Sequence, residues 1–131
     1  MTEVCTFDVY EGNLVNVTFR SNVMVTVENF QSDFIFKLQG MIDACAPFTL
    51  FVDTVQIQNV PMSVSYSVIK FMRSNRETIR SYMLASAIII ESELVRNLLA
   101  GVFAVVPPVS PNMLTDDHAA GLQFIESRMP Q

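Results

Sequence analysis

The stretch Phe-Thr-Leu-Phe-Val, residues 48 to 52, is an almost uninterrupted run of apolar and β-branched residues. A run of this length without polar alternation is typical of a strand that is buried on both faces between helices. Ala46-Pro47 comes directly before it, and the residue before a proline is disfavoured in a helix. We therefore expect a helix to end here and residues 48–52 to form the central strand of a sheet.

Toward the N-terminus, residues 5–10 and 14–19 are rich in Val, Thr and aromatic residues, and Glu11-Gly12-Asn13 between them has turn chemistry. This pattern predicts a β-hairpin. Residues 23–27 are expected to add a short strand, and Asn29 to cap a helix. The helix has an apolar stripe at three-to-four spacing, made of Phe30, Phe34, Leu38, Met41 or Ile42, and Cys45.

Beyond the central strand, Pro61 suits the first turn of a helix. That helix is expected to run into residues 76–80, with one apolar side. Its members are Val64, Val68, Phe71 and Met72. Residues 82–90 return to strand character, and Ser92 with Glu93 opens a further helix.

Three prolines, at positions 107, 108 and 111, make a stiff connector after that helix. Residues 112–114 are then expected to form a short edge strand, and Thr115 to cap the last helix. Strands that alternate with helical patterns predict one α/β domain over residues 1–131. Its mixed β-sheet is opened by the N-terminal hairpin and packed with about four helices.

The order of elements from about Pro47 to Ser127 resembles the STAS-like domains of bacterial anti-sigma-factor antagonists, in their SpoIIAA-like branch related to the lipid-binding CRAL-TRIO fold. The residues that carry the resemblance are Phe51-Val52-Asp53, the basic-tailed helix, the strand at 85–90, Val95-Arg96-Asn97-Leu98-Leu99, and Thr115-Asp116-Asp117 before Phe124-Ile125. The resemblance implies a STAS-like fold and a phosphorylatable serine near Ser63. The acid and glycine that adjoin this serine in the family are missing from residues 59–64, so an ordinary capping hydroxyl is the alternative.

Composition narrows the functional classes. Half of the 131 residues are apolar and 16% are charged, with a net charge of −5, which is typical of a folded domain. The longest apolar stretches fall short of the ~20 residues that span a bilayer, so no transmembrane segment is expected. The N-terminus lacks the pattern of a secretory signal, which favours a cytoplasmic or other intracellular location. An acidic balance argues against nucleic acid as a partner.

Residues for catalysis or metal binding are few. His118 is the one histidine, and the two cysteines, Cys5 and Cys45, lie far apart and are expected to be reduced. Asp53 ends the central strand, where an aspartate usually caps the following loop. We therefore expect no enzyme, no cofactor and no metal, although a magnesium site made only of carboxylates stays open.

The leading hypothesis is a non-enzymatic protein-protein interaction module, either self-associating or an accessory subunit of a larger assembly. An excess of apolar residues supports it. The candidate interface consists of Ala100, Val102, Phe103, Val105, Val106 and Val109, with packing on the chain's own sheet as the alternative. A candidate basic patch, for an acidic partner or peripheral lipid contact, consists of Lys70, Arg73, Arg76 and Arg80. The second hypothesis is a carrier or sensor of a lipid or other hydrophobic ligand, with a pocket lined by Phe30, Phe34, Phe36 and the segment Val105-Val106.

Overall fold

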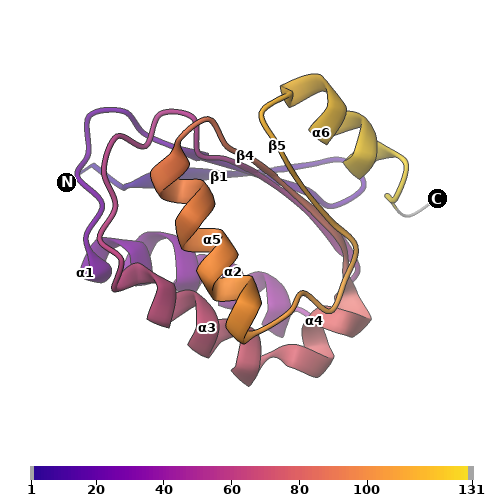
Figure 1. Cartoon of the computed structure of the whole chain (residues 1–131). Coiled ribbons are helices and arrows are strands. Elements are labelled where there is room, and N and C mark those ends of the chain that lie inside the picture. The colour runs from indigo at the N-terminus through magenta and orange to yellow at the C-terminus, as the bar shows by residue number, and fades with distance from the viewer. Residues whose placement is uncertain (1, 130–131) are drawn as a thin grey trace.

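A five-stranded mixed β-sheet organises the protein, which the computed structural model describes over residues 2–129. The strands follow one another across the sheet in chain order (Figure 1), and they are β1 (Cys5–Tyr10), β2 (Leu14–Phe19), β3 (Phe48–Asp53), β4 (Met83–Ile89) and β5 (Asn112–Thr115). The first pair is antiparallel and the other three pairs are parallel. The predicted hairpin, the central position of β3 and the short edge strand β5 are therefore confirmed, and so is the α/β class with a mixed sheet.

Helices cover both faces of the sheet unequally. They are α1 (Val27–Phe30), the π-helical segment η1 (Gln31–Ile35), α2 (Phe36–Asp43), α3 (Val64–Ser74), α4 (Arg76–Tyr82), α5 (Glu93–Val105) and α6 (His118–Glu126). In the part of the chain that the structure describes, α6 lies by itself on one face, and the other helices lie on the opposite face (Figure 1). The larger helical layer and the sheet enclose the main core.

The helix expected from Pro61 to about Arg80 is two helices, because the chain breaks at Asn75. This residue leaves helical geometry, with φ −118° and ψ 17°. The side-chain amide nitrogen of Asn75 donates one hydrogen bond to the backbone carbonyl oxygen of Phe71 at 2.9 Å. It donates a second one to the side-chain oxygen of Gln39 in α2 at 2.8 Å. The asparagine thus satisfies the end of α3 and ties it to α2, and α4 starts in a new direction.

Two helix starts also differ from the sequence-based expectation. Residues 23–27 form no strand, and α1 is capped by Thr26, with Asn29 at the third helical position. The Thr26 hydroxyl accepts from the Asn29 N–H at 3.1 Å while the Asn29 side chain accepts from the Thr26 N–H at 2.8 Å. This reciprocal capping box satisfies two backbone donors at once. At α6 the cap is Asp117, and Thr115 ends β5.

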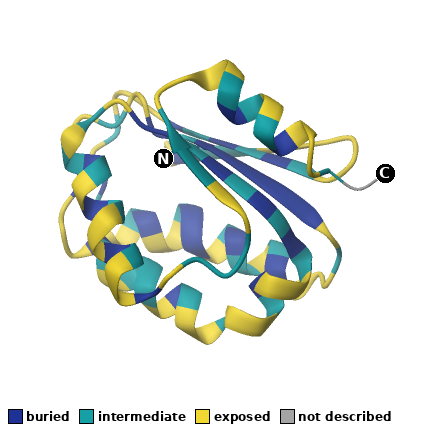
Figure 2. Ribbon diagram, turned by 45° about the vertical axis from the view of Figure 1, so that its right-hand side comes forward, coloured by how far each residue is buried: buried dark blue, intermediate teal, exposed yellow. Residues whose placement is uncertain are grey.

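Burial alternates along β2 and β4, whereas β3 is buried on both faces. Figure 2 shows the central strands buried over most of their length. Toward the larger helical layer they present Val15, Val17, Phe19, Phe48, Leu50 and Val52. Toward α6 they present Phe51, Ala85, Ala87 and Ile89, against which Ile125 packs. The smaller face has two alanines in β4, and Gly121 of α6 lies over Ile89, so this helix sits close to the sheet.

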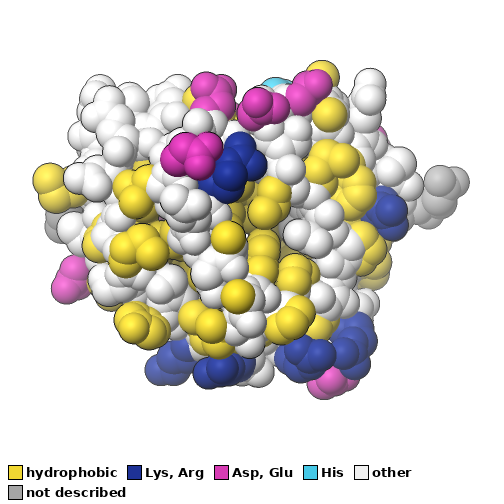
Figure 3. All heavy atoms as spheres, viewed as in Figure 1, with side chains coloured by type: hydrophobic (Ala, Val, Ile, Leu, Met, Phe, Trp, Pro, Cys, Tyr) yellow, Lys and Arg dark blue, Asp and Glu magenta, His cyan; other side chains and the backbone are white. Residues whose placement is uncertain are grey.

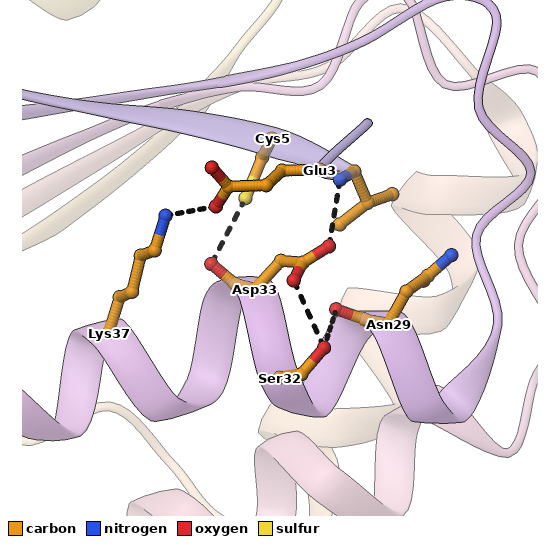
Figure 4. A network of polar contacts seen from close by, with 7 residues as sticks. Glu3, Cys5, Asn29, Ser32, Asp33 and Lys37 are labelled. Atoms are coloured by element: carbon orange, nitrogen blue, oxygen red, sulfur yellow. Dashed lines mark hydrogen bonds and ion pairs between the residues drawn. The ribbon is translucent and has the colours of Figure 1, made fainter. Parts of the chain in front are cut away.

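A group of polar contacts fixes the start of β1 to the first helix (Figure 4). The side-chain carboxylate of Asp33, in the π-helical segment, accepts a hydrogen bond from the backbone N–H of Val4 at 2.9 Å. The backbone carbonyl oxygen of Asp33 accepts one from the thiol of Cys5 at 3.6 Å. Lys37, one turn later, pairs with Glu3. Burial, and secondly the charge of Asp33, raises the pKa of the Cys5 thiol to about 12. The thiol is therefore neutral and unreactive at physiological pH.

Candidate functional site

An apolar cavity lies between the sheet and the larger helical layer. Its volume is about 160 Å³. Helices α2, α3, α4 and α5, the inner face of β2 to β5, and the connector after α5 all contribute to its wall. The cavity is close in size to engineered cavities of about 150 Å³ that stay dry and bind benzene.

Helix α5 and the connector after it form one side of this cavity. The helix packs against α3, and it lines the cavity with Val95, Leu98, Leu99 and Phe103. Ser92 caps its first turn, accepting from the N–H groups of Leu94 and Val95 at 3.1 and 3.4 Å. Its other end leads into the proline-rich connector, which carries the chain back to β5. The helix and the connector thus line the cavity opposite the inner face of β4.

Aromatic and aliphatic side chains make up almost all of the wall, and none of the described residues that line it is charged. One end is closed by three phenylalanine rings, of Phe19, Phe30 and Phe34, whose centroids are 5.1 to 6.2 Å apart. Val68, Leu99, Phe103 and Val109 also contribute apolar side chains to the wall. A wall of this kind cannot offset the desolvation of a charged group, so it suits a neutral, hydrophobic occupant.

Three of the polar lining residues gather at one side, where the cavity approaches the surface. They are Ser86 of β4, Ser110 of the connector and Asn112 of β5. Ser86 and Ser110 are half-buried and Asn112 is exposed. Figure 3 shows apolar side chains along the strip of surface between α5 and β5, which is the same region. The mouth of the cavity therefore lies between α5 and the β4–β5 edge.

Two of the five predicted ligand-contacting side chains line this cavity. Phe30 and Phe34 do so, whereas Phe36 is 73% exposed. A residue two positions further along a helix points about 200° away, so Phe36 cannot share the face of Phe34. Val105 lies two positions after Phe103, which lines the cavity, and is exposed for the same geometric reason. Val106 is buried but does not line the cavity.

The predicted interface residues separate into three groups. Val102 and Val106 are buried in the chain's own core. Phe103 and Val109 line the cavity and are half-buried. Ala100 is exposed, and so is Val105, with 51% of its surface accessible. These residues therefore do not form one continuous outward-facing apolar surface.

Ser63 and the basic residues lie on the outside of α3 and α4. Ser63 occupies the N-cap position of α3, and its hydroxyl makes no capping hydrogen bond. The four members of the basic patch, Lys70, Arg73, Arg76 and Arg80, are all exposed. Figure 3 shows lysine and arginine side chains gathered along the lower edge, over these helices. Arg80 forms an ion pair with Glu77 at 3.2 Å.

The chemistry-bearing residues singled out from the sequence do not come together. Asp53 caps the loop after β3 by accepting from the Val55 N–H at 2.9 Å. His118 is exposed at the start of α6, with its ring edge-on to Phe51 at 5.0 Å between centroids. Cys5 and Cys45 are both free thiols. Within residues 2–129, no three His, Cys, Asp or Glu side chains are placed to hold a metal ion.

Sequence reasoning missed the polar mouth. The signal was present, since Ser86 is the one hydroxyl residue in the strand sequence Met-Leu-Ala-Ser-Ala-Ile-Ile. None of the helices in the described range is both long and apolar enough to cross a membrane. Comparison of the chain with protein-family models, with curated proteins and with solved structures gave no match. What the protein does is therefore inferred from the geometry of its own residues.

Proposed function

We propose that the protein is a non-enzymatic carrier or sensor that binds a small hydrophobic molecule between its sheet and its larger helical layer. The observation that carries this proposal is the cavity of about 160 Å³ with an aromatic and aliphatic wall. The second hypothesis from the sequence thus takes precedence over the interaction module, and Phe30 and Phe34 are the ligand-facing residues that both sequence and structure support.

Energetics also favour an occupant. The wall is almost entirely apolar, so a hydrophobic molecule that enters the cavity transfers its own surface out of water at about 25 cal/mol per Å². A ligand that fills the space restores the missing dispersion contacts on all sides.

Toluene is a suitable first probe, because it is neutral, apolar and small enough for the cavity. Titration of the protein with toluene, followed by thermal denaturation, is expected to raise the melting temperature, and above the dissociation constant the rise should follow the logarithm of the free toluene concentration. At ten times the dissociation constant the stabilisation is about 1.4 kcal/mol. For a domain of this length that corresponds to a shift of about 5 °C. Native mass spectrometry of the purified protein reports in parallel whether a natural ligand of low mass is retained.

Two phenylalanine substitutions on different helices give the matched comparison. Val68→Phe places a ring in the cavity from α3 and is expected to abolish the toluene shift. Val105→Phe adds the same ring on the exposed side of α5 and is expected to leave the shift unchanged. Leu99→Phe, from the opposite wall, replaces Val68→Phe if that variant is unstable. A toluene shift that survives both cavity substitutions would contradict the proposal.

A protein-interaction role is the second candidate, and the free edge of β1 favours it. This strand pairs with β2 on one side only, and Val9 and Tyr10 near its end are 55% and 53% exposed. An unpaired edge with apolar side chains is a template for adding a strand from another chain. We expect native mass spectra to show a bare oligomer, or a partner-dependent assembly, that Val9→Lys weakens. A monomer at all concentrations, unaffected by Val9→Lys, argues against self-association.

Kinship with the STAS-like domains stays a prediction, supported by the order of elements after residue 47. The phosphorylation site at Ser63 belongs to the same prediction. Its exposure at the start of α3 makes the hydroxyl accessible to a kinase, and a phosphate there would add negative charge to this end of the helix. Mass spectrometry of protein purified from its native source, before and after phosphatase treatment, tests this.

A further inference from the structure

Three of the four polar residues that line the cavity, Ser86, Ser110 and Asn112, lie at its mouth. Ser86 and Asn112 are register partners in the parallel pair β4 and β5, so their side chains point to the same face of the sheet. That face is otherwise apolar, with Ile88 and Leu114 as the next inward pair. Ser110, two residues before Asn112, adds a second hydroxyl.

These polar side chains have unused hydrogen-bonding capacity. Thr54, a fourth polar lining residue, is satisfied because its hydroxyl donates to the carbonyl oxygen of Ile89 at 2.7 Å. Among the described residues, no such partner engages the side chains of Ser86, Ser110 or Asn112. The Ser86 backbone N–H donates to the carbonyl oxygen of Pro111 at 3.0 Å, which holds the connector beside the strand. The two hydroxyls and one amide thus offer both donors and acceptors to a bound molecule.

From this arrangement we propose that the ligand is a neutral amphiphile with one hydrogen-bonding head, such as an alcohol, a phenol or a primary amide. The head binds Ser86 and Asn112 at the mouth, and the hydrocarbon body extends toward Phe30 and Phe34. The inference rests on the proposed function and narrows it to a chemical class. A carboxylate or an amine is disfavoured because the wall contains no charge of either sign to compensate it.

The experiment compares ligands that differ in one group. Toluene and benzyl alcohol have the same ring, and benzoate and benzylammonium add a negative or a positive charge. Dissociation constants are measured by calorimetry for the wild type and for Ser86→Ala, Asn112→Ala and the double variant. Ser81→Ala, an exposed serine on α4 outside the cavity wall, is the control.

We expect the wild type to bind benzyl alcohol at least as tightly as toluene, although a purely apolar cavity would penalise the hydroxyl. The double variant should weaken benzyl alcohol about tenfold, which corresponds to about 1.4 kcal/mol and is within the range of one hydrogen bond. Toluene binding should stay within about twofold in every variant, and Ser81→Ala should change neither ligand. The two charged probes should bind at least about a hundredfold more weakly than benzyl alcohol.

The outcomes separate the two proposals. If toluene binds but benzyl alcohol is weaker and insensitive to Ser86→Ala and Asn112→Ala, the head-group assignment is overturned while the cavity remains a ligand site. Tighter binding of benzoate or benzylammonium would overturn the assignment in favour of a charged ligand. If neither toluene nor benzyl alcohol binds, the proposed function fails, and the head-group assignment fails with it.

Discussion

Replacing Gly121 by alanine tests how tightly α6 is packed against the sheet. A Cβ atom at this position would lie 2.6 Å from Cδ1 of Ile89 and 3.4 Å from the ring of Phe51. Ile89 is 1% exposed, so its end has little free space into which it can move. Overpacking of this kind costs about 1–3 kcal/mol. Alanine in a helix gains about 1 kcal/mol over glycine. We therefore expect Gly121→Ala to lower the free energy of unfolding by about 1 kcal/mol.

Two other helical glycines provide matched controls. A Cβ at Gly40 of α2 or at Gly101 of α5 would meet nothing within 4 Å. Gly40→Ala and Gly101→Ala therefore show the propensity gain alone and should raise the free energy of unfolding by up to about 1 kcal/mol. The same substitution is thus expected to have opposite signs at Gly121 and at the two controls, measured by urea denaturation with a common m-value.

A double-mutant cycle with Ile89→Val tests whether the contact with Cδ1 of Ile89 causes the destabilisation expected for Gly121→Ala. Alone, Ile89→Val removes Cδ1 and costs about 0.5–1.5 kcal/mol. In the double variant the new Cβ occupies the space that Cδ1 has left, so the free energy of unfolding should return close to that of the wild type. The expected coupling energy is about 2 kcal/mol. Additivity within about 0.5 kcal/mol would show that the two groups do not compete for space, and would refute this account of the packing.

Three further changes test other parts of the core. The folded state raises the pKa of the Cys5 thiol from 9.0 to about 12. The contribution of this thiol to the free energy of unfolding is therefore fully present below pH 9, and it falls by about 1.4 kcal/mol per pH unit as the pH rises toward 12. Cys5→Ala should remove this share of the alkaline loss, and Cys45→Ala, at an exposed thiol, should not. Asp33→Ala leaves the buried N–H of Val4 without its acceptor and should lower the free energy of unfolding, measured by chemical denaturation, by about 1–3 kcal/mol. Asp33→Asn keeps an oxygen acceptor and should recover most of this loss. Equal losses in both variants would contradict the role of the acceptor. The hydroxyl of Thr49 is buried and has no hydrogen-bond partner among the described residues. Thr49→Val should therefore leave the free energy of unfolding, measured by thermal denaturation, unchanged or raise it by about 1 kcal/mol. A clear loss would point to a partner such as bound water.

Local patterns predicted most of the secondary structure correctly. The hairpin strands and the central strand are where alternation and the apolar run place them, and Ser92 caps α5 as its position before an apolar helical pattern indicates. The errors lie where a side chain acts over a distance. Asn75 ends α3 partly through its bond to Gln39 of another helix, which no local pattern reports.

The sequence by itself determined the α/β class, the mixed sheet and the scarcity of catalytic groups, because these depend on residue type and on spacing within one segment. Tertiary structure alone decided that Phe30 and Phe34 face a cavity while Phe36 faces solvent, and that Ser86 meets Asn112 at its mouth. A cavity is the space left between elements far apart in the chain. Its size therefore depends on the distances between packed helices and strands, which the periodicity of a single segment does not contain.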